Sequence, residues 1–315
     1  MLQRIRDACS RVAERARYVR IAGDVEDYLA TFDARSLARP GYDTECHYLG
    51  DPEATLAYVL VLDAVNFGSG YFPELLPARG ERGYRMLAKG LTAWFQADPP
   101  SAETLAGLDA PAVAEVLGQD LETPLRLELM RLYAEALREL GGYVLSRFRG
   151  SFTALVSAAG HKAERLAVLL AEMPFFRDVW RYDGFEVPLY KRAQIVASDL
   201  ALAFDETGHG AFTDLGRLTM FADNLVPHVL RCDGVLEVAP ALSRRIDQGV
   251  RLRAGSPEEI ELRAVALVAV ERLAAAARER GLAVRPRDLD VALWERGQAA
   301  PYAARPPHRT LTTAY

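Results

Sequence analysis

Three charged residues in two segments have types and spacing that suit acid–base or electrostatic chemistry. In PLYKRAQIVASDL, Lys191 and Asp199 are eight positions apart. That separation is just over two turns of a helix, so both side chains can face one side. In LTMFADNLVPHVL, Asp223 interrupts an apolar run. An acid buried in such a run must be ion-paired, hydrogen-bonded or protonated. These residues are therefore the first candidates for a reactive site.

A third segment, LVLDAVNFGSGYFPELL at 60–76, combines residue types that can hold a planar ligand. Asp63 and Asn66 are polar residues beside apolar neighbours. The stretch Gly68–Ser69–Gly70 allows a close approach of the backbone, and aromatic residues flank it on both sides. Aromatic rings offer flat apolar faces, and the acid and the amide offer hydrogen bonds.

Each of these segments also has a purely structural interpretation. Lys191 and Asp199 could lie on a solvated helix face. Asp223 could cap the N-terminus of a helix, with Asn224 in the turn. The glycines could end a helix, and the aromatic residues that follow them, from Tyr71 on, could fill the core. The residue pattern leaves both interpretations open.

No metal or cofactor motif is visible in the sequence. The histidines are not clustered at the spacing of metal ligands; they are His47, His161, His209, His228 and His308. A GxSxG elbow, a Walker loop and a GxGxxG fingerprint are all absent from the sequence. Their absence argues against the common serine hydrolases, P-loop enzymes and Rossmann dehydrogenases. We therefore predict neither a bound metal ion nor a cofactor.

The composition is that of a soluble globular protein. The 315 residues include 43 acidic and 38 basic ones, for a net charge of −5, whereas proteins that hold nucleic-acid polymers usually need a basic surface. The three cysteines, Cys9, Cys46 and Cys232, form no CxxC pair. The N-terminus lacks the apolar region of a secretory signal, and no stretch approaches the ~20 apolar residues of a bilayer span. We predict a cytoplasmic protein that binds neither a membrane nor a nucleic-acid polymer.

The segments that must position these residues are predicted to be mostly helices. Apolar residues recur at helical spacing over 2–17, 125–140 and 161–173. The segment GSPEEIELRAVALVAVERLAAAARER is the clearest helix, because Ser256 precedes Pro257 and Glu259 follows three positions after the serine. This order predicts a capping box at the start of a helix of about 25 residues.

Strand signals are few. They are confined to VPLY at 187–190 and, as a weaker candidate, YVLVL at 58–62. No internal repeat or long linker divides the chain. We predict a mostly α-helical fold with a single domain spanning 1–315, which could form two lobes that meet at a central cleft.

Together these segments resemble the queuosine salvage family of queuosine 5′-phosphate N-glycosylase/hydrolases. The resemblance runs from about residue 40 to the C-terminus. It rests on YVLVLDAVNFGSGYFPEL, PLYKRAQIVASDL, LTMFADNLVPHVL, the GSPEEIELRA helix and the tail from PPHRT to Tyr315. It implies a helical fold similar to DNA glycosylases of the helix–hairpin–helix kind. It also implies hydrolysis of the bond that joins a modified 7-deazaguanine base, queuine, to ribose 5′-phosphate, so that queuine can be reinserted into tRNA.

The resemblance also implies roles for the charged residues. Cleavage of an N-glycosidic bond builds positive charge on the sugar, which a fixed carboxylate can stabilise while it orients the attacking water. Asp223 is the first candidate for that carboxylate and Asp199 is the reserve. Lys191 would bind the 5′-phosphate or keep the carboxylate charged, and Arg192 would assist with the phosphate.

The remaining candidates would hold the substrate. Asp63 and Asn66 would read the edge of the base, and His47 would line the mouth of the site. The stacking walls would be Phe67, Tyr71, Phe72 and Tyr190. The other expected substrate contacts are Ser69, Phe221 and Asn224.

One segment departs from the family pattern. Where members commonly read Phe-Ala-Asp-Tyr-Arg-x-Pro-Gln, residues 221–228 read FADNLVPH. The acid and the proline remain, but the tyrosine–arginine pair and the glutamine are replaced.

Two other functions stay open at this stage. The likeness to DNA glycosylases fits a nucleic-acid-binding or repair protein, although the negative net charge counts against it. A pocket that binds queuine without turnover would make the protein a carrier.

Overall fold

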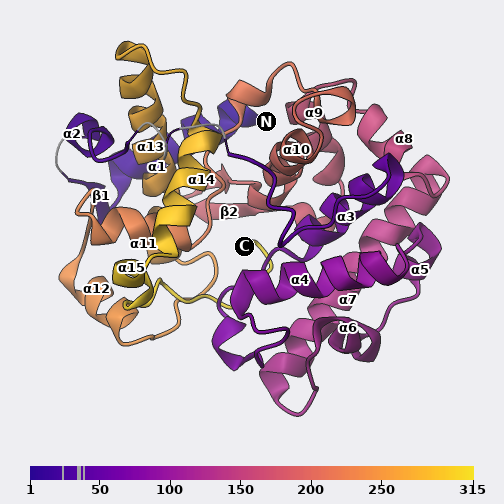
Figure 1. The fold of residues 1–315 in the computed structure, drawn as a ribbon. Helices are drawn as coiled ribbons and strands as arrows, with labels where there is room; N and C mark the ends of the chain where they lie inside the picture. The colour runs from indigo at the N-terminus through magenta and orange to yellow at the C-terminus, as the bar shows by residue number, and fades with distance from the viewer. Residues whose placement is uncertain (23–24, 34–36, 38–39) are drawn as a thin grey trace.

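The computed structural model describes residues 1–22, 25–33, 37 and 40–315, and most of them are helical (Figure 1). The helices are α1 (Leu2–Arg15), α2 (Val25–Leu29), α3 (Pro52–Val65), α4 (Gly83–Ala97), α5 (Ala102–Ala106), α6 (Ala110–Leu117), α7 (Pro124–Phe148), α8 (Phe152–Ser157), α9 (Ala163–Leu170), α10 (Lys191–Ala203), α11 (Leu225–Cys232), α12 (Pro240–Asp247), α13 (Pro257–Glu279), α14 (Pro286–Gly297) and α15 (Ala300–Ala303). The prediction of a mostly α-helical fold is confirmed. The likeness to helix–hairpin–helix DNA glycosylases stays a prediction.

Four short strands in the described residues form two small antiparallel pairs. Strands β1 (Val19–Ile21) and β4 (Leu236–Val238) pair with Arg20 opposite Glu237. Strands β2 (Val179–Tyr182) and β3 (Phe185–Pro188) form a hairpin. The predicted strand at VPLY is therefore correct only for its first two residues. None of these strands is long enough to carry the core.

The weaker strand prediction, YVLVL at 58–62, is wrong, because this segment lies in α3. Asp51 caps the helix by accepting a hydrogen bond from the Ala54 N–H at 3.0 Å, and Pro52 takes a first-turn position, where no N–H is needed. Every residue from Ala54 to Val65 is buried. A helix that is buried on all sides has no polar face, so its sequence lacks the period of an amphipathic helix.

At the start of α13, only one of the two hydrogen bonds of the predicted capping box forms. Ser256 Oγ accepts a hydrogen bond from the Glu259 N–H at 3.4 Å. The Glu259 carboxylate does not return to the serine. It accepts from the Gly255 N–H at 3.1 Å and pairs with Arg263 at 3.3 Å. The Glu259 carboxylate thus pairs with the buried guanidinium of Arg263 instead of accepting the second hydrogen bond of the capping box.

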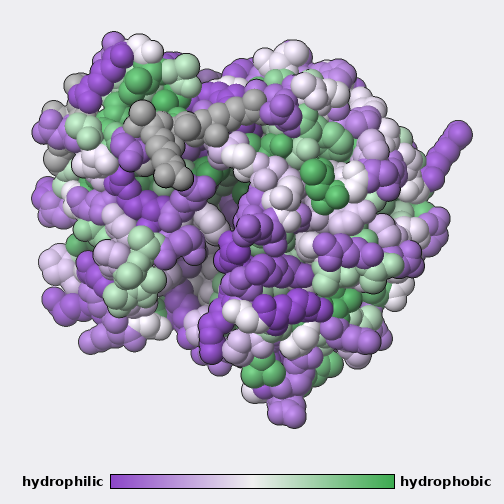
Figure 2. Space-filling view, viewed as in Figure 1, coloured by the Kyte–Doolittle hydropathy of each residue, from purple (hydrophilic) through white to green (hydrophobic). Residues whose placement is uncertain are grey.

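Two groups of helices pack on either side of the C-terminal segment (Figure 1). Helix α13 packs against α1, α2, α11 and α14, and α3 packs against α4, α7, α8 and α10. The buried apolar side chains form one cluster that runs from Leu2 to Leu293. The visible face is hollowed between the two groups (Figure 2). The prediction of one domain with two lobes and a central cleft stays a prediction. Among the described helices, none has the length and apolar character that a membrane crossing requires.

The last residues of the chain pass between these two groups of helices. Leu252 and Thr310 form a parallel bridge. The Gly68 N–H donates to the Tyr315 carbonyl at 2.8 Å, and the Tyr315 side chain is buried with the Arg263 guanidinium 4.6 Å from its ring centre. The tail therefore connects the loop after α3 with the strongly buried helix α13.

Candidate active site

Lys191, the first residue of α10, is the cation at the centre of the site. Its side chain is buried, and Nζ donates a hydrogen bond to the Asn66 carbonyl at 3.2 Å. Burial lowers the pKa of Lys191, while the charges of Asp223 and Asp63 raise it. The ammonium group is therefore held among carboxylates that come from different helices.

Asp63 is the most deeply buried of these carboxylates. It lies on α3, is fully buried, and accepts a hydrogen bond from Asn66 Nδ2 at 3.2 Å. Its other oxygen, Oδ2, has no hydrogen-bond partner in the described part of the chain. Burial, followed by the charge of Asp199, raises the pKa of Asp63 well above its usual value, although Lys191 lowers it. The neutral form of Asp63 is therefore favoured until a cation or a hydrogen-bond donor reaches its free oxygen.

Asp199 lies two turns after Lys191 on α10, as the spacing predicted, and its side chain is only partly buried. Burial raises the pKa of Asp199 to about 7, against the lowering effect of Lys191 and Arg287. At neutral pH this carboxyl group is close to half ionised, so it can exchange a proton or respond to a ligand charge.

Asp223 combines the structural and the electrostatic interpretation of its segment. Its Oδ1 accepts hydrogen bonds from the N–H groups of Leu225 at 2.9 Å and Val226 at 3.1 Å, so it caps the start of α11. Burial raises the pKa of Asp223, and Lys191 and the two N–H groups lower it. The cap fixes the direction of the carboxylate without hiding it, because the side chain stays partly exposed.

Asp290 on α14 completes the cluster, and the sequence analysis missed it. Its Oδ1 accepts a hydrogen bond from the Phe221 N–H at 2.9 Å, two residues before Asp223. Burial, followed by the charge of Asp223, raises the pKa of Asp290 well above its usual value. The same signal that singled out Asp223, an acid within an apolar run, is present in LDVALW.

Lys191 therefore lies between two pairs of carboxyl groups, Asp63 with Asp199 and Asp223 with Asp290. Within each pair, the charge of one member raises the pKa of the other. Burial raises the pKa of all four acids, whereas Lys191 lowers it and an arginine lowers it at three of them, so the four groups hold a proton with different strength. Acids that differ in this way can divide the roles of carboxylate and proton donor, which acid–base chemistry on one substrate requires.

Aromatic side chains border the pair formed by Asp63 and Asp199. Burial and then the charge of Asp199 raise the pKa of Tyr84. The Tyr84 hydroxyl is 2.9 Å from His47 Nε2, and its ring lies edge-on to Trp294 with the centroids 5.6 Å apart. Trp294 is one turn after Asp290 on α14, so the two point to the same side. The Tyr84–Trp294 contact joins α4 to α14 across the site.

Tyr42 belongs to this border as well. Its pKa is raised by burial and by the charges of Tyr58, Asp199 and Asp63, and its hydroxyl donates to the Tyr48 carbonyl at 2.9 Å. The sequence analysis identified His47 in this region but missed Tyr42, Tyr84 and Trp294. No local pattern distinguishes them, because they come from the loop before α3, from the start of α4 and from α14.

Several aromatic candidates do not line the acid cluster. Phe67 is buried in the core, where its ring packs against Tyr133 with the centroids 4.9 Å apart. Tyr71 is also buried, and its hydroxyl donates to Glu128 at 3.0 Å. Both lack an open ring face in this structure, because neighbouring side chains cover them. Phe72 is half-buried and lies near Gly83, the first residue of α4.

Four other candidates have no hydrogen bond from their side chains to the acid cluster in the described residues. Tyr190 precedes α10 and has a left-handed backbone with φ 49°. The charges that act on its hydroxyl include those of Arg177 and Arg4 and none from the acid cluster. Phe221 is buried and contributes its N–H to Asp290. Asn224 donates from Nδ2 to the His308 carbonyl at 3.1 Å and thereby holds the tail. Ser69 Oγ is buried without a partner in the described residues.

Arg192 has a structural environment that differs from the expected phosphate site. Its guanidinium is buried and donates to the carbonyls of Ala64 and Thr313, both at 2.7 Å, and to that of Phe175. A fourth bond reaches the Asp63 carbonyl at 3.3 Å. Since these carbonyls occupy most of its donors, Arg192 ties α3 to the C-terminal tail in this structure.

Within the described residues, one group offers a possible set of metal ligands. The ligand atoms of Asp43, Cys46 and His47 lie within 4.8 Å of one another. Both nitrogens of His47 already have partners, the Asp43 carbonyl at 3.1 Å and the Tyr84 hydroxyl at 2.9 Å. A metal ion would have to displace one of them, and the expectation of no metal stays a prediction.

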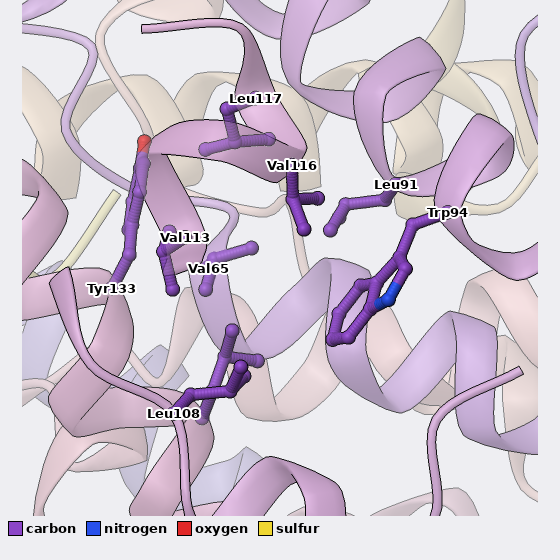
Figure 3. Close-up of a pocket in the computed structure, with 9 residues that line it drawn as sticks. Val65, Leu91, Trp94, Leu108, Val113, Val116, Leu117 and Tyr133 are labelled. Carbon is purple, nitrogen blue, oxygen red and sulfur yellow. The ribbon is translucent and has the colours of Figure 1, made fainter. Parts of the chain in front are cut away.

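A small apolar cavity lies apart from the charged residues. It is enclosed by α3, α4, α6 and α7 and has a volume of about 10 Å³ (Figure 3). Its lining includes Val65, Leu91, Trp94 and Leu117, and no charged side chain. A space of this size holds at most one water molecule, so it is a packing defect and not a substrate site.

Comparison with known proteins shows which family this chain belongs to. The sequence model of the queuosine salvage protein family matches residues 46–315. A Sphaerobacter thermophilus protein named queuosine 5′-phosphate N-glycosylase/hydrolase is 40% identical over 97% of this chain and 95% of that protein. Proteins of the same name from Dictyostelium discoideum and Mus musculus are 35% and 28% identical, over 84% and 80% of this chain and 79% and 73% of their own lengths. The chain therefore belongs to the queuosine salvage protein family.

Proposed function

We propose that this protein hydrolyses the N-glycosidic bond of queuosine 5′-phosphate and releases queuine for reinsertion into tRNA. The observation that carries the proposal is the cluster of four acids around the buried Lys191, in a chain that aligns over 97% of its length with a relative named for this activity. We assign the reaction to the cytosol. A fold like that of the helix–hairpin–helix DNA glycosylases, with a central cleft, is part of the same proposal.

The chemistry explains why several carboxyl groups are useful. A 7-deazaguanine base has carbon in place of the basic ring nitrogen at position 7, so protonation there cannot help the base to leave. The barrier must be lowered by stabilising the positive charge on the sugar and by donating hydrogen bonds to the departing base. A cluster that contains both an ionised and a protonated acid can do both.

Asp223 is the proposed carboxylate beside the sugar. The water oxygen bonds to the anomeric carbon, the electron pair of the glycosidic bond leaves with the base, and Asp223 accepts a proton from the water. A protonated acid of the cluster, such as Asp290, returns a proton to the base. The charge of Lys191 favours the ionised form of Asp223, against burial, which raises the pKa of that acid. Lys191 is enclosed by carboxylates, which makes it a poor site for a phosphate.

The pair formed by Asp63 and Asp199, with Asn66, is the proposed base end of the site. The rings of Tyr84, Trp294 and Tyr42 border this pair and offer faces for the base. This assignment moves the stacking role from the buried Phe67 and Tyr71 to residues with partly exposed rings.

A turnover assay tests the proposal. Purified protein is mixed with queuosine 5′-phosphate without added metal, and free queuine is followed by chromatography and mass spectrometry. Release of queuine by the wild type and its loss in Asp223→Asn are expected. Tight binding of queuine without release would instead indicate a carrier, and a salt-dependent gel shift with duplex DNA would indicate a nucleic-acid-binding protein.

A further inference from the structure

The Asp199 carboxylate is the least satisfied charged group in the described part of the site. None of the hydrogen bonds among the described residues engages its oxygens, and its side chain is partly exposed. The two cations whose charges reach it are bound elsewhere. Lys191 Nζ donates to the Asn66 carbonyl, and Arg287 donates to Ser198 Oγ at 3.2 Å and to Glu206 at 3.1 Å.

Asp63, next to it, also has an unsatisfied oxygen. Its side chain is completely buried, and Oδ2 has no partner in the residues that the structure describes. A buried acceptor without a donor costs about 1–3 kcal/mol. Two neighbouring acids with free oxygens therefore form an acceptor site that a ligand can satisfy, and the excess of negative charge favours a cationic donor.

The aromatic border adds a second attraction for a cation. Tyr84 and Tyr42 are close enough to Asp199 for its charge to raise the pKa of both hydroxyls. Trp294 meets Tyr84 edge-on at 5.6 Å. His47 brings no competing charge, because burial lowers its pKa. Aromatic rings near a carboxylate are a combination that binds alkylammonium groups.

We propose that Asp199 and Asp63, with the rings of Tyr84 and Trp294, bind the cationic secondary amine that queuine carries on its substituent at position 7. This inference rests on the proposed function, and it assigns the base specificity of the site to charge. The ring system alone, without the amine, would leave both acids unsatisfied. A base with a neutral group at position 7 is therefore bound more weakly.

Binding of free bases tests the inference separately from turnover. Calorimetry at neutral pH compares queuine and 7-aminomethyl-7-deazaguanine, which are cations, with 7-cyano-7-deazaguanine, which has the same ring system without an amine. The wild type is expected to bind both cations at least tenfold more tightly than the cyano base, as for hydrogen bonds between charged groups. In Asp199→Asn the ratio of the dissociation constants should fall to about one.

A matched control and a second variant keep the test decisive. Asp98→Asn removes the same charge from an exposed position at the end of α4 and should retain the wild-type ratio. Asp63→Asn should lower the ratio as Asp199→Asn does, and it replaces Asp199→Asn if that variant fails to fold. The inference is overturned if the wild type binds the cyano base as tightly as the cations, or if it binds none of the three bases. It is also overturned if the Asp199 and Asp63 variants weaken all three bases equally. Failure of the proposed function would appear differently, as binding of queuine without cleavage of queuosine 5′-phosphate.

Discussion

The charge of Lys191 lowers the pKa of Asp223, although the two residues begin different structural elements. Lys191 starts α10, and Asp223 caps α11 through hydrogen bonds of 2.9 and 3.1 Å to the N–H groups of Leu225 and Val226. Burial acts in the opposite direction and raises the pKa of Asp223. Because these effects compete, the ionisation of the proposed reactive acid depends on a cation from another helix.

Asp223→Asn should reduce turnover by about 10²–10⁴-fold, because the amide keeps the shape of the side chain but removes its charge. Affinity for queuosine 5′-phosphate should stay within about tenfold of the wild type. Single-turnover kinetics and calorimetry measure the two quantities separately. Turnover near the wild-type rate would transfer the role to Asp199.

Lys191→Met should move the acidic limb of the pH–kcat profile to higher pH. Lys191 lowers the pKa of Asp223, so its loss raises that pKa and leaves the acid protonated until a higher pH. The profile is measured from about pH 5 to pH 9 with the nucleotide and with the nucleoside. If Lys191 bound the phosphate instead, the variant would raise KM for the nucleotide alone and leave the limb where it is.

Asp199→Asn should stabilise the protein, and more at pH 8 than at pH 5. The folded-state pKa of Asp199 is about 7, above its ordinary value of 3.8. Between these values the folded chain holds a proton that the unfolded chain releases, so rising pH destabilises the wild type across this window. Asparagine does not titrate. The gain should reach at least about 1 kcal/mol, or roughly 2–4 °C in melting temperature.

Thermal melts of the wild type, Asp199→Asn and the exposed control Asp98→Asn at both pH values measure this effect. A constant difference between Asp199→Asn and the wild type at the two pH values would contradict the assignment of the raised pKa. Stabilisation together with lost base selectivity would identify Asp199 as a residue kept for function at the expense of stability.

Gly70→Ala should destabilise the fold by displacing the C-terminal tail. A Cβ at this position would lie 2.0 Å from the Thr310 carbonyl oxygen, and Arg309 Nε already holds the Gly70 carbonyl at 2.6 Å. Overpacking of this kind costs about 1–3 kcal/mol. The melting temperature should fall and activity should fall with it, since the tail also holds Asn224 and Arg192.

Gly142→Ala is the matched control for this substitution. Gly142 lies inside α7, and an added Cβ would meet nothing within 4 Å. Alanine should leave the melting temperature unchanged or raise it, because it favours the helix by about 0.5–1 kcal/mol. Equal melting temperatures for the two alanine variants would mean that the C-terminal tail shifts away from the alanine at position 70 without loss of stability.

The sequence by itself determined the helical character of the chain and most of the charged cluster. Asp63 and Asp223 stood out as polar residues among apolar neighbours, whose burial requires a special environment. Lys191 and Asp199 stood out because their spacing puts them on one side of a helix. The capping signals at Ser256 and Pro257 likewise placed the start of α13. These inferences needed only the local order of residues.

The tertiary structure decided which side chains share one space. Asp290, Tyr84, Trp294 and Tyr42 reach the acid cluster from separate elements, and no local spacing encodes that meeting. Packing also chose the direction of each side chain, which put the rings of Phe67 and Tyr71 in the core. Packing also placed the guanidinium of Arg192 where it donates hydrogen bonds to backbone carbonyls. Side-chain direction and mutual burial arise from contacts distant in the chain, and they alone set the charge balance of the site.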